Sequence, residues 1–343
     1  MDECEVTVII PHYNGEDILS DCLYSLEKNV TIDVNILLVD NGSSDNSVSM
    51  VKETYPQVEI LEMEKNLGFA GGCNAGVKAS TTPYVLILNN DTIHKRGWIA
   101  SLLEKFKSSD DIAAVQPKLL SFQEKGDFDY SGAAGGEIDL LGYPFARGRI
   151  FDFIEEDSGQ YQNSGENIFW ASGTAFLTRK DLMLESGAFD ENFFAHMEEI
   201  DLDWRFHLMG YRVVIEPESV VWHRSGYTLG AESNFKKYLN HRNNLIMFLS
   251  NYKLFTTCYL LPIRILLEWI NIFASLFKGD PGRSKSILKA HLWLITNLKK
   301  IIQKRKKVQE LRELGDFTIM KKMHIGSIAL EHYLLGKKTI SDL

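Results

Sequence analysis

The sequence is poor in cysteine and has no pattern that would pair the few it contains. Its four cysteines are scattered over 343 residues and none forms a C-x-x-C pair, so neither a zinc site nor a disulfide framework is indicated. The first residues, M-D-E-C, lack the basic residues and the long apolar core of a secretory signal. We therefore expect the catalytic part of the chain to work in the reducing cytoplasm.

Two signatures of nucleotide chemistry are also missing. The glycine-rich stretch 66–72 does not match G-x-G-x-x-G, which disfavours a dinucleotide-binding protein. No basic, glycine-rich loop follows the first predicted strand, which disfavours a nucleotidyltransferase. We expect no nucleic-acid partner.

What remains is the composition of a globular protein, with 45% hydrophobic and 24% charged residues. Between residue 5 and about residue 115, short apolar stretches alternate with segments of helical spacing. This alternation predicts an α/β fold, with a mostly parallel sheet that helices cover on both faces. The predicted strands are Glu5–Ile10, Val34–Val39, Val58–Leu61 and Val85–Leu88.

Polar side chains follow these strands where each strand ends. Ligands of open α/β sheets bind beyond the carboxyl ends of the strands, so these side chains are candidates for ligand binding. A carboxylate after the second strand can accept hydrogen bonds from a base or ribose, and a glycine-rich helix start can face phosphate. Asp91 suits a metal ligand, although Asn and Asp also cap helices. The residues are Pro11, Tyr13, Asn14, Asp40, Asn89, Asn90 and Asp91.

A second candidate site is the acidic cluster E-E-I-D-L-D at residues 198–203, at the start of a predicted helix. Acids in a first helical turn complement the helix dipole, but four within six residues exceed that need. Glu198 and Asp201 are i,i+3 neighbours on one face, whereas Glu199 points elsewhere. The three acids therefore cannot share one role.

Four motifs resemble those of family-2 glycosyltransferases with the GT-A fold, of the rhamnosyltransferase-like type that acts in bacterial cell-surface polysaccharide synthesis. They occur in the family's order and are V-I-I-P-H-Y-N-G-E (8–16), L-L-V-D-N-G-S-S-D (37–45), N-L-G-F-A-G-G-C-N-A-G (66–76) and L-N-N-D-T (88–92). The segments E-E-I-D (198–201) and V-V-W-H (220–223) resemble the second half of the family.

The resemblance implies an inverting, metal-dependent transfer from a UDP- or dTDP-sugar to a saccharide or lipid-linked saccharide. It assigns Glu199 as the catalytic base, with Asp201 and Glu198 as alternatives, and it assigns Asp91 and His223 to a divalent metal, Mg²⁺ or Mn²⁺. The residues assigned to the donor are Pro11, Tyr13, Asn14, Asp40, Asn66, Gly68, Asn74, Asn89 and Asn90.

The chain departs from the family pattern at two positions. Asn89 stands where the first Asp of the D-x-D motif is usual, and Glu199 stands where Asp is the more common base. These departures leave open an alternative function, a catalytically weak or inactive sugar-nucleotide-binding or scaffold protein of the same fold.

We divide the chain into a catalytic domain, residues 1–250, and a helical C-terminal region, residues 251–343. The catalytic domain comprises a nucleotide-binding half, 1–118, and an acceptor half, 119–250. Within the second half, residues 120–167 are rich in glycine and include R-G-R at 147–149. This stretch is either a surface insertion or an acceptor-binding lid, whose aromatic and arginine side chains contact sugar or phosphate.

The longest apolar run, Leu254–Phe277, is long enough to cross a membrane. Its polar residues form one stripe, which disfavours an isolated span and leaves a packed core helix or an in-plane interfacial helix. Residues 278–313 carry 11 Lys and Arg against 3 Asp and Glu, a composition that suits anionic lipid. We favour peripheral attachment to the inner face of the cytoplasmic membrane. The stripe consists of Thr257, Arg264, Glu268, Asn271 and Ser275.

Overall fold

The computed structural model describes residues 4–224 and 233–343, so the residues before Cys4 lie outside it. The first third of the chain alternates strands and helices, as the apolar pattern predicts, and each predicted strand is present within two residues of its expected bounds. Its elements are β1 (Val6–His12), α1 (Glu16–Asn29), β2 (Val34–Asp40), α2 (Ser47–Thr54), β3 (Glu59–Glu62), α3 (Gly68–Ala79), β4 (Tyr84–Leu88), β5 (Thr92–His94), α4 (Trp98–Lys107) and β6 (Ile112–Ser121).

Residues 119–250 add further strands and the helix that carries the acidic cluster. The sequence W-A-S-G-T-A-F-L-T at residues 170–178 has the pattern of one strand, but regular pairing begins only at Ala175. The glycine-rich stretch 120–167 is not all loop, since it contains short strands. The elements are β7 (Gly136–Ile138), β8 (Pro144–Ala146), β9 (Arg149–Ile150), β10 (Phe153–Ile154), β11 (Asn167–Ile168), β12 (Ala175–Arg179), α5 (Lys180–Glu185), η1 (Glu191–Phe193), α6 (Glu198–Leu208) and β13 (Arg212–His223).

The central sheet has the order β11-β13-β6-β12-β4-β1-β2-β3, with β5 paired to β13. Strands β4, β1, β2 and β3 are parallel, whereas β12 runs antiparallel to both of its neighbours. The parallel strands therefore end at one edge of the sheet, which is where the polar residues were predicted to meet. A separate four-stranded sheet has the order β10-β9-β8-β7.

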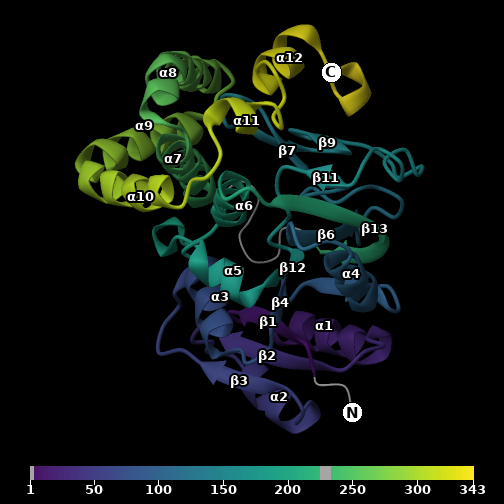
Figure 1. Cartoon of the computed structure of the whole chain (residues 1–343). Helices are drawn as coiled ribbons and strands as arrows, with labels where there is room; N and C mark the ends of the chain where they lie inside the picture. Colours follow the sequence, from purple (N-terminus) through teal and green to yellow (C-terminus); the bar gives the residue numbers. More distant parts are fainter. Residues whose placement is uncertain (1–3, 225–232) are drawn as a thin grey trace.

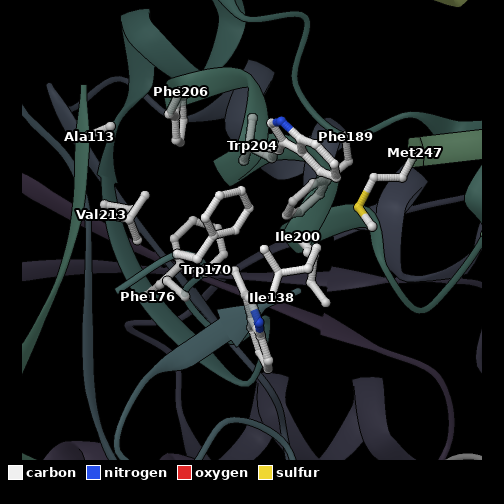
Figure 2. Close-up of a cluster of buried hydrophobic side chains, with 14 of the residues drawn as sticks. Ala113, Ile138, Trp170, Phe176, Phe189, Ile200, Trp204, Phe206, Val213 and Met247 are labelled. Carbon is white, nitrogen blue, oxygen red and sulfur yellow. The ribbon is translucent and has the colours of Figure 1, made fainter. Parts of the chain in front are cut away.

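Two cores hold the catalytic part together. One lies between the sheet and α1, α2 and α4. The other joins the opposite face of the sheet to α6 and α7 (Asn234–Asn251). Figure 2 shows the second core, in which Phe189, Trp204 and Met247 lie close together in the view and Trp170 lies near Ile138. Helix α6 is thus fixed by apolar burial along nearly its whole length.

The C-terminal helices pack beside α6 and α7 at one end of the molecule (Figure 1). The elements after α7 are α8 (Leu254–Phe277), α9 (Pro281–Thr296), α10 (Leu298–Glu310), α11 (Asp316–Met320), α12 (Ile328–Leu335) and η2 (Ile340–Asp342). The basic segment 278–313 contains two helices, α9 and α10, which are separated at Asn297, because the backbone of that residue lies outside the helical region.

Candidate active site

Hydrogen bonds connect the ends of β1, β2 and β4. Pro11 and His12 close β1, and His12 lies in register with Asp40 at the end of β2. The Asn90 side chain donates to His12 Nδ1 at 2.7 Å. Burial lowers the pKa of His12, although Asp45 and Asp40 act in the opposite direction, so the ring is a neutral acceptor. Asp40 is buried and accepts from the Ser43 backbone N–H at 3.2 Å.

The turn after β1 is tied to the turn after β2. Asn14 has a left-handed backbone, with φ 55°, and its side-chain oxygen accepts from the Ser44 N–H at 2.8 Å. The Asn14 N–H in turn donates to Ser43 Oγ at 3.0 Å. Tyr13 lies between His12 and Asn14, both of which are hydrogen-bonded, and its own side chain is exposed. The predicted donor residues Tyr13, Asn14 and Asp40 are therefore brought to one surface.

The glycine-rich start of α3 approaches the loop before α6. Gly68 has φ 74°, and a Cβ on it would lie 2.4 Å from the Phe194 carbonyl oxygen, so no other residue fits. Asn66 caps this turn through a 2.8 Å bond from the Gly68 N–H. Asn74 is buried and binds the Phe189 backbone at both its amide atoms, at 2.9 and 3.0 Å. Asn74 thus serves the contact between α3 and the segment that leads into η1, rather than the exposed edge of the sheet.

Asp91 and His223 meet because β5 pairs with the end of β13, which places His223 opposite Thr92. His223 Nε2 lies 3.1 Å from Asp91 Oδ1, and its Nδ1 lies 2.9 Å from Asp129 Oδ1. Burial alone would lower the pKa of His223, but Asp129 and Asp91 outweigh it and raise the pKa to about 10. Between two carboxylates the metal-free ring is cationic, so a metal bound at Nε2 would replace the proton on that nitrogen.

This pair suits a divalent cation. Asp91 Oδ1 is buried without a well-aligned hydrogen bond in the described part of the chain, and an imidazole nitrogen faces it. Carboxylate and imidazole are ligands of Mn²⁺, and carboxylate also of Mg²⁺. Within residues 4–224 and 233–343, no group of three or more His, Cys, Asp or Glu is arranged around one metal position. Two protein ligands leave the remaining positions to a diphosphate and water.

Glu199 lies in the first turn of α6, beside the segment that precedes β12. A Cβ on Gly173 would lie 3.7 Å from the Glu199 carboxyl carbon, so Gly173 lies within van der Waals distance of the carboxylate. Its Oε2 is buried and lacks a hydrogen-bond partner among the described residues. Burial raises the pKa of Glu199 to about 7, although hydrogen bonds from the backbone N–H groups of Glu199, Gly173 and Ile200 act to lower it. Such a carboxyl exchanges protons near neutral pH.

Glu199 also lies near the metal end. The Asn89 N–H donates to the Thr174 carbonyl at 2.8 Å, next to Gly173. The segment 173–174 therefore lies beside Glu199 at Gly173 and is bonded to Asn89, two residues before Asp91, at Thr174. One short segment thus connects the surroundings of the predicted base and of the predicted metal ligand.

The other two candidate acids have different environments. Asp201 is fully buried and contacts Arg205 at 3.1 Å, Lys304 at 2.8 Å and Asn251 at 3.2 Å. Those partners occupy both of its oxygens. Glu198 is buried, and burial together with the charge of Glu199 raises its pKa well above the ordinary value. Of the three acids, Glu199 is the half-buried one with an unused oxygen.

The loop that presents Glu198 and Glu199 is held by α7. Phe194, His196 and Met197 all have positive φ, between 66° and 73°, which is costly for residues with a side chain. The Asn243 amide donates to the carbonyls of Phe193, Ala195 and His196, at 2.8 to 3.0 Å. One side chain therefore stabilises the strained approach to α6.

Three residues that the sequence did not single out belong to this site. His12 lies within the P-H-Y-N motif, so the motif itself was the available indication. Asp129 contacts His223 only because the chain folds back after β6, with Phe128 bridged to Leu120. Asn243 lies in a polar turn of α7 whose partners are about 50 residues away.

Residues 7–184 match the family model of glycosyl transferase family 2. The poly-beta-1,6-N-acetyl-D-glucosamine synthase of Staphylococcus aureus (strain MSSA476) is 25% identical over 235 residues, which cover 67% of this chain and 52% of the synthase. The chain thus spans about half the length of the curated relatives it matches.

Two solved structures share the fold. GalNAc-T7 has a TM-score of 0.56 at 15% identity, covering 73% of this chain and 48% of that one. The mannosyltransferase PcManGT of Pyrobaculum calidifontis has a TM-score of 0.52 at 15% identity, covering 97% and 88%. The expected GT-A fold is confirmed. By its sequence, the chain belongs to glycosyl transferase family 2.

Proposed function

We propose that the protein transfers a sugar from a UDP- or dTDP-sugar to a hydroxyl of a saccharide or lipid-linked saccharide, with inversion, in cell-surface polysaccharide synthesis. The observation that carries this proposal is that the Gly173–Thr174 segment lies beside Glu199 at Gly173 and accepts a hydrogen bond from Asn89, two residues before Asp91, at Thr174. A base and a metal ligand connected through one short segment can address the two ends of one displacement.

The donor lies along the edge of the sheet where β1, β2 and β4 end. Asp40 and the turn at Asn14 receive the nucleoside, and the Asp91 end receives the diphosphate. Asp91 and His223 hold a divalent cation, Mg²⁺ or Mn²⁺, which supplies positive charge to the leaving diphosphate. Support comes from GalNAc-T7, solved with UDP, GalNAc and Mn²⁺, and from the mannosyltransferase, solved with GDP-Man and Mn²⁺.

Glu199 acts on the acceptor. Its carboxylate accepts the proton of the attacking hydroxyl while the acceptor oxygen bonds to the anomeric carbon and the bond to the diphosphate breaks. A pKa of about 7 leaves a large fraction of Glu199 ionised at neutral pH and still basic enough to take the proton. Attack from the side opposite the diphosphate inverts the anomeric centre.

Melting shifts with a panel of UDP- and dTDP-sugars, each with and without Mn²⁺ or Mg²⁺, test the donor assignment. We expect one donor to stabilise the protein in a metal-dependent way. Asp91→Asn keeps the shape of the side chain and removes its charge, so it should abolish the metal-dependent part of the shift. Asp110→Asn, an exposed position in the turn between α4 and β6, is the control. An unchanged metal response in Asp91→Asn refutes the assignment.

We also place the protein on the inner face of the cytoplasmic membrane, attached through α8. Every exposed residue of α8 is apolar, whereas its polar stripe faces the protein. Arg264 and Glu268 pair at 2.7 Å, and Glu268 also binds His241 of α7 at 2.8 Å. The exposed face consists of Leu254, Phe255, Cys258, Tyr259, Pro262, Ile263, Leu266, Trp269, Ile270, Phe273, Leu276 and Phe277.

The adjoining helices continue this face with positive charge. Leu288, Leu292 and Ile295 of α9 are exposed beside lysines, a combination that suits an anionic bilayer surface. Helix α8 is also long and apolar enough to cross a membrane by length and composition alone. The exposed lysines are Lys285, Lys289, Lys299, Lys300, Lys306 and Lys307.

Sedimentation with phosphatidylcholine vesicles, with and without phosphatidylglycerol, tests this attachment. We expect salt-sensitive binding to the anionic vesicles and its loss in the Trp269→Glu, Phe273→Glu double variant. Tyr24→Glu, an exposed aromatic on α1, should bind normally. Resistance to carbonate extraction supports a spanning helix instead. Self-association without vesicle binding assigns the face to a second copy of the chain.

A further inference from the structure

Arg149, the first of the two residues of β9, is a buried cation with almost no hydrogen-bond partner. The residue is 7% exposed. Its one hydrogen bond, from Nη1 to the Phe151 carbonyl, is 3.5 Å long, and its Nε is buried without a partner. Asp129 and Asp152 carry the nearest negative charges, but no ion pair joins either of them to Arg149 within the described residues. A buried charge in this state costs folding free energy.

The other buried arginines of the described chain are well bonded. Arg205, Arg242 and Arg264 each donate at least two side-chain hydrogen bonds of 3.2 Å or less. Arg147, two residues before Arg149, pairs with Glu137 at 2.9 Å and donates to two carbonyls. The unused donors of Arg149 are therefore a property of this position and not of the region.

Arg149 lies next to the metal end of the active site. Its guanidinium stacks on the ring of Tyr130, with 4.6 Å between Cζ and the ring centroid. The neighbour of Tyr130 is Asp129, whose carboxylate contacts His223, which contacts Asp91. Tyr130 is 44% exposed, so one wall of the Arg149 position opens to solvent.

A series of contacts connects Arg149 with the C-terminal end of α8. Phe151, which accepts the Arg149 hydrogen bond, packs against Tyr333 of α12 with 5.1 Å between ring centroids. Lys278, directly after α8, lies 5.7 Å from the centroid of the same Tyr333 ring. Aromatic rings and cations thus run from the end of α8 to the candidate metal ligands.

We propose that Arg149, stacked on Tyr130, binds a phosphate group of a substrate. The planar guanidinium suits phosphate oxygens, which would provide the acceptors that the protein withholds from it. A lipid-linked acceptor carries such a phosphate next to its lipid, and the donor carries a diphosphate. The position between Asp91 and α8 favours the acceptor. This inference rests on the proposed function for the identity of the substrate, but the anion site itself does not.

Calorimetry with two probes separates the sources of the phosphate. Geranyl diphosphate stands for the acceptor, and UDP with Mn²⁺ stands for the donor. We expect Arg149→Met in the full chain to weaken geranyl diphosphate binding by about tenfold or more, since a hydrogen bond to a charged group is lost, and to leave UDP binding unchanged. Arg147→Gln is the matched control and should leave both affinities unchanged.

A melting curve distinguishes binding from a structural role. Arg149→Met removes an unpaired buried charge at similar volume, so the melting temperature without ligand should stay or rise. If UDP binding weakens in place of geranyl diphosphate binding, the phosphate site stands and belongs to the donor. Unchanged affinity for both probes overturns the proposal, and so does a variant that fails to fold. Failure of the wild type to bind UDP would count against the proposed function alone.

Discussion

Replacing Glu199 with glutamine should make the protein more stable and less active at the same time. The carboxyl is half-buried with an unpaired oxygen, and its pKa rises from the ordinary 4.5 to about 7 on folding. Between these two values the folded protein keeps a proton that the unfolded chain has released. Stability therefore falls as the pH rises from about 4.5 to about 7. The amide of Glu199→Gln does not titrate and escapes this loss.

The size of the effect follows from the pKa shift. A shift of about 2.5 units at about 1.4 kcal/mol per unit gives an upper value of about 3 kcal/mol. Urea unfolding at pH 5 and at pH 8 measures it. We expect the free energy of unfolding of Glu199→Gln, relative to that of the wild type, to be higher at pH 8 than at pH 5 by about 1 to 3 kcal/mol. Glu59→Gln, an exposed change on β3, should show no such pH dependence.

The same variant tests catalysis. Removing a general base typically costs a factor of about 10² to 10⁴ in rate. The wild-type rate should rise with pH through about 7, because the base must be ionised, and the residual rate of the variant should lack that step. A variant with normal transfer, or with the same stability difference at pH 5 and pH 8, would refute the argument that Glu199 is a buried base.

The remaining predictions concern the support of Glu199. Asp201→Asn should lower stability by about 3 kcal/mol in urea unfolding, because it leaves Lys304 with less charge to pair in a buried network; unchanged stability would return Asp201 to the list of candidate bases. Asn243→Ala should lower kcat more than it raises KM, because three loop carbonyls lose their donor. Gly68→Ala should lower the melting temperature, because its Cβ would meet the Phe194 carbonyl at 2.4 Å.

The fold could be predicted from the sequence where local patterns decide the structure. The apolar strands and the helical spacing of the first third need no long-range information, and α8 matches its predicted bounds. The stretch Trp170–Thr174 could not be predicted in this way. It has the composition of a strand, but only Trp170 forms an isolated bridge, to Gly136, and Gly173 instead lies beside Glu199.

The site was predictable in its residue types and less so in its contacts. The strand-end rule and the family motifs indicate Asp40, Asp91 and Glu199. Spacing alone could not separate Glu199 from Asp201. Two of the residues that bind the Asp201 carboxylate come from α7 and α10, as much as 103 positions away. Similarly, charge counting treats the basic segment 278–313 as one surface, whereas Lys304 within it points inward.

The C-terminal helices carry the exposed apolar face, and they also hold α6 and the loop before it. Lys304 of α10 bridges Asp201 of α6 at 2.8 Å and Asp190 in the turn before η1 at 3.0 Å. On α7, His241 binds Glu268 of α8, and two residues further on Asn243 holds the loop that leads to Glu199. A displacement of α8 would therefore act through the Glu268–His241 pair on α7, the helix that also holds the loop before Glu199. Of the polar stripe of α8, Arg264 and Glu268 are the residues that form ion pairs, and they form them at this connection.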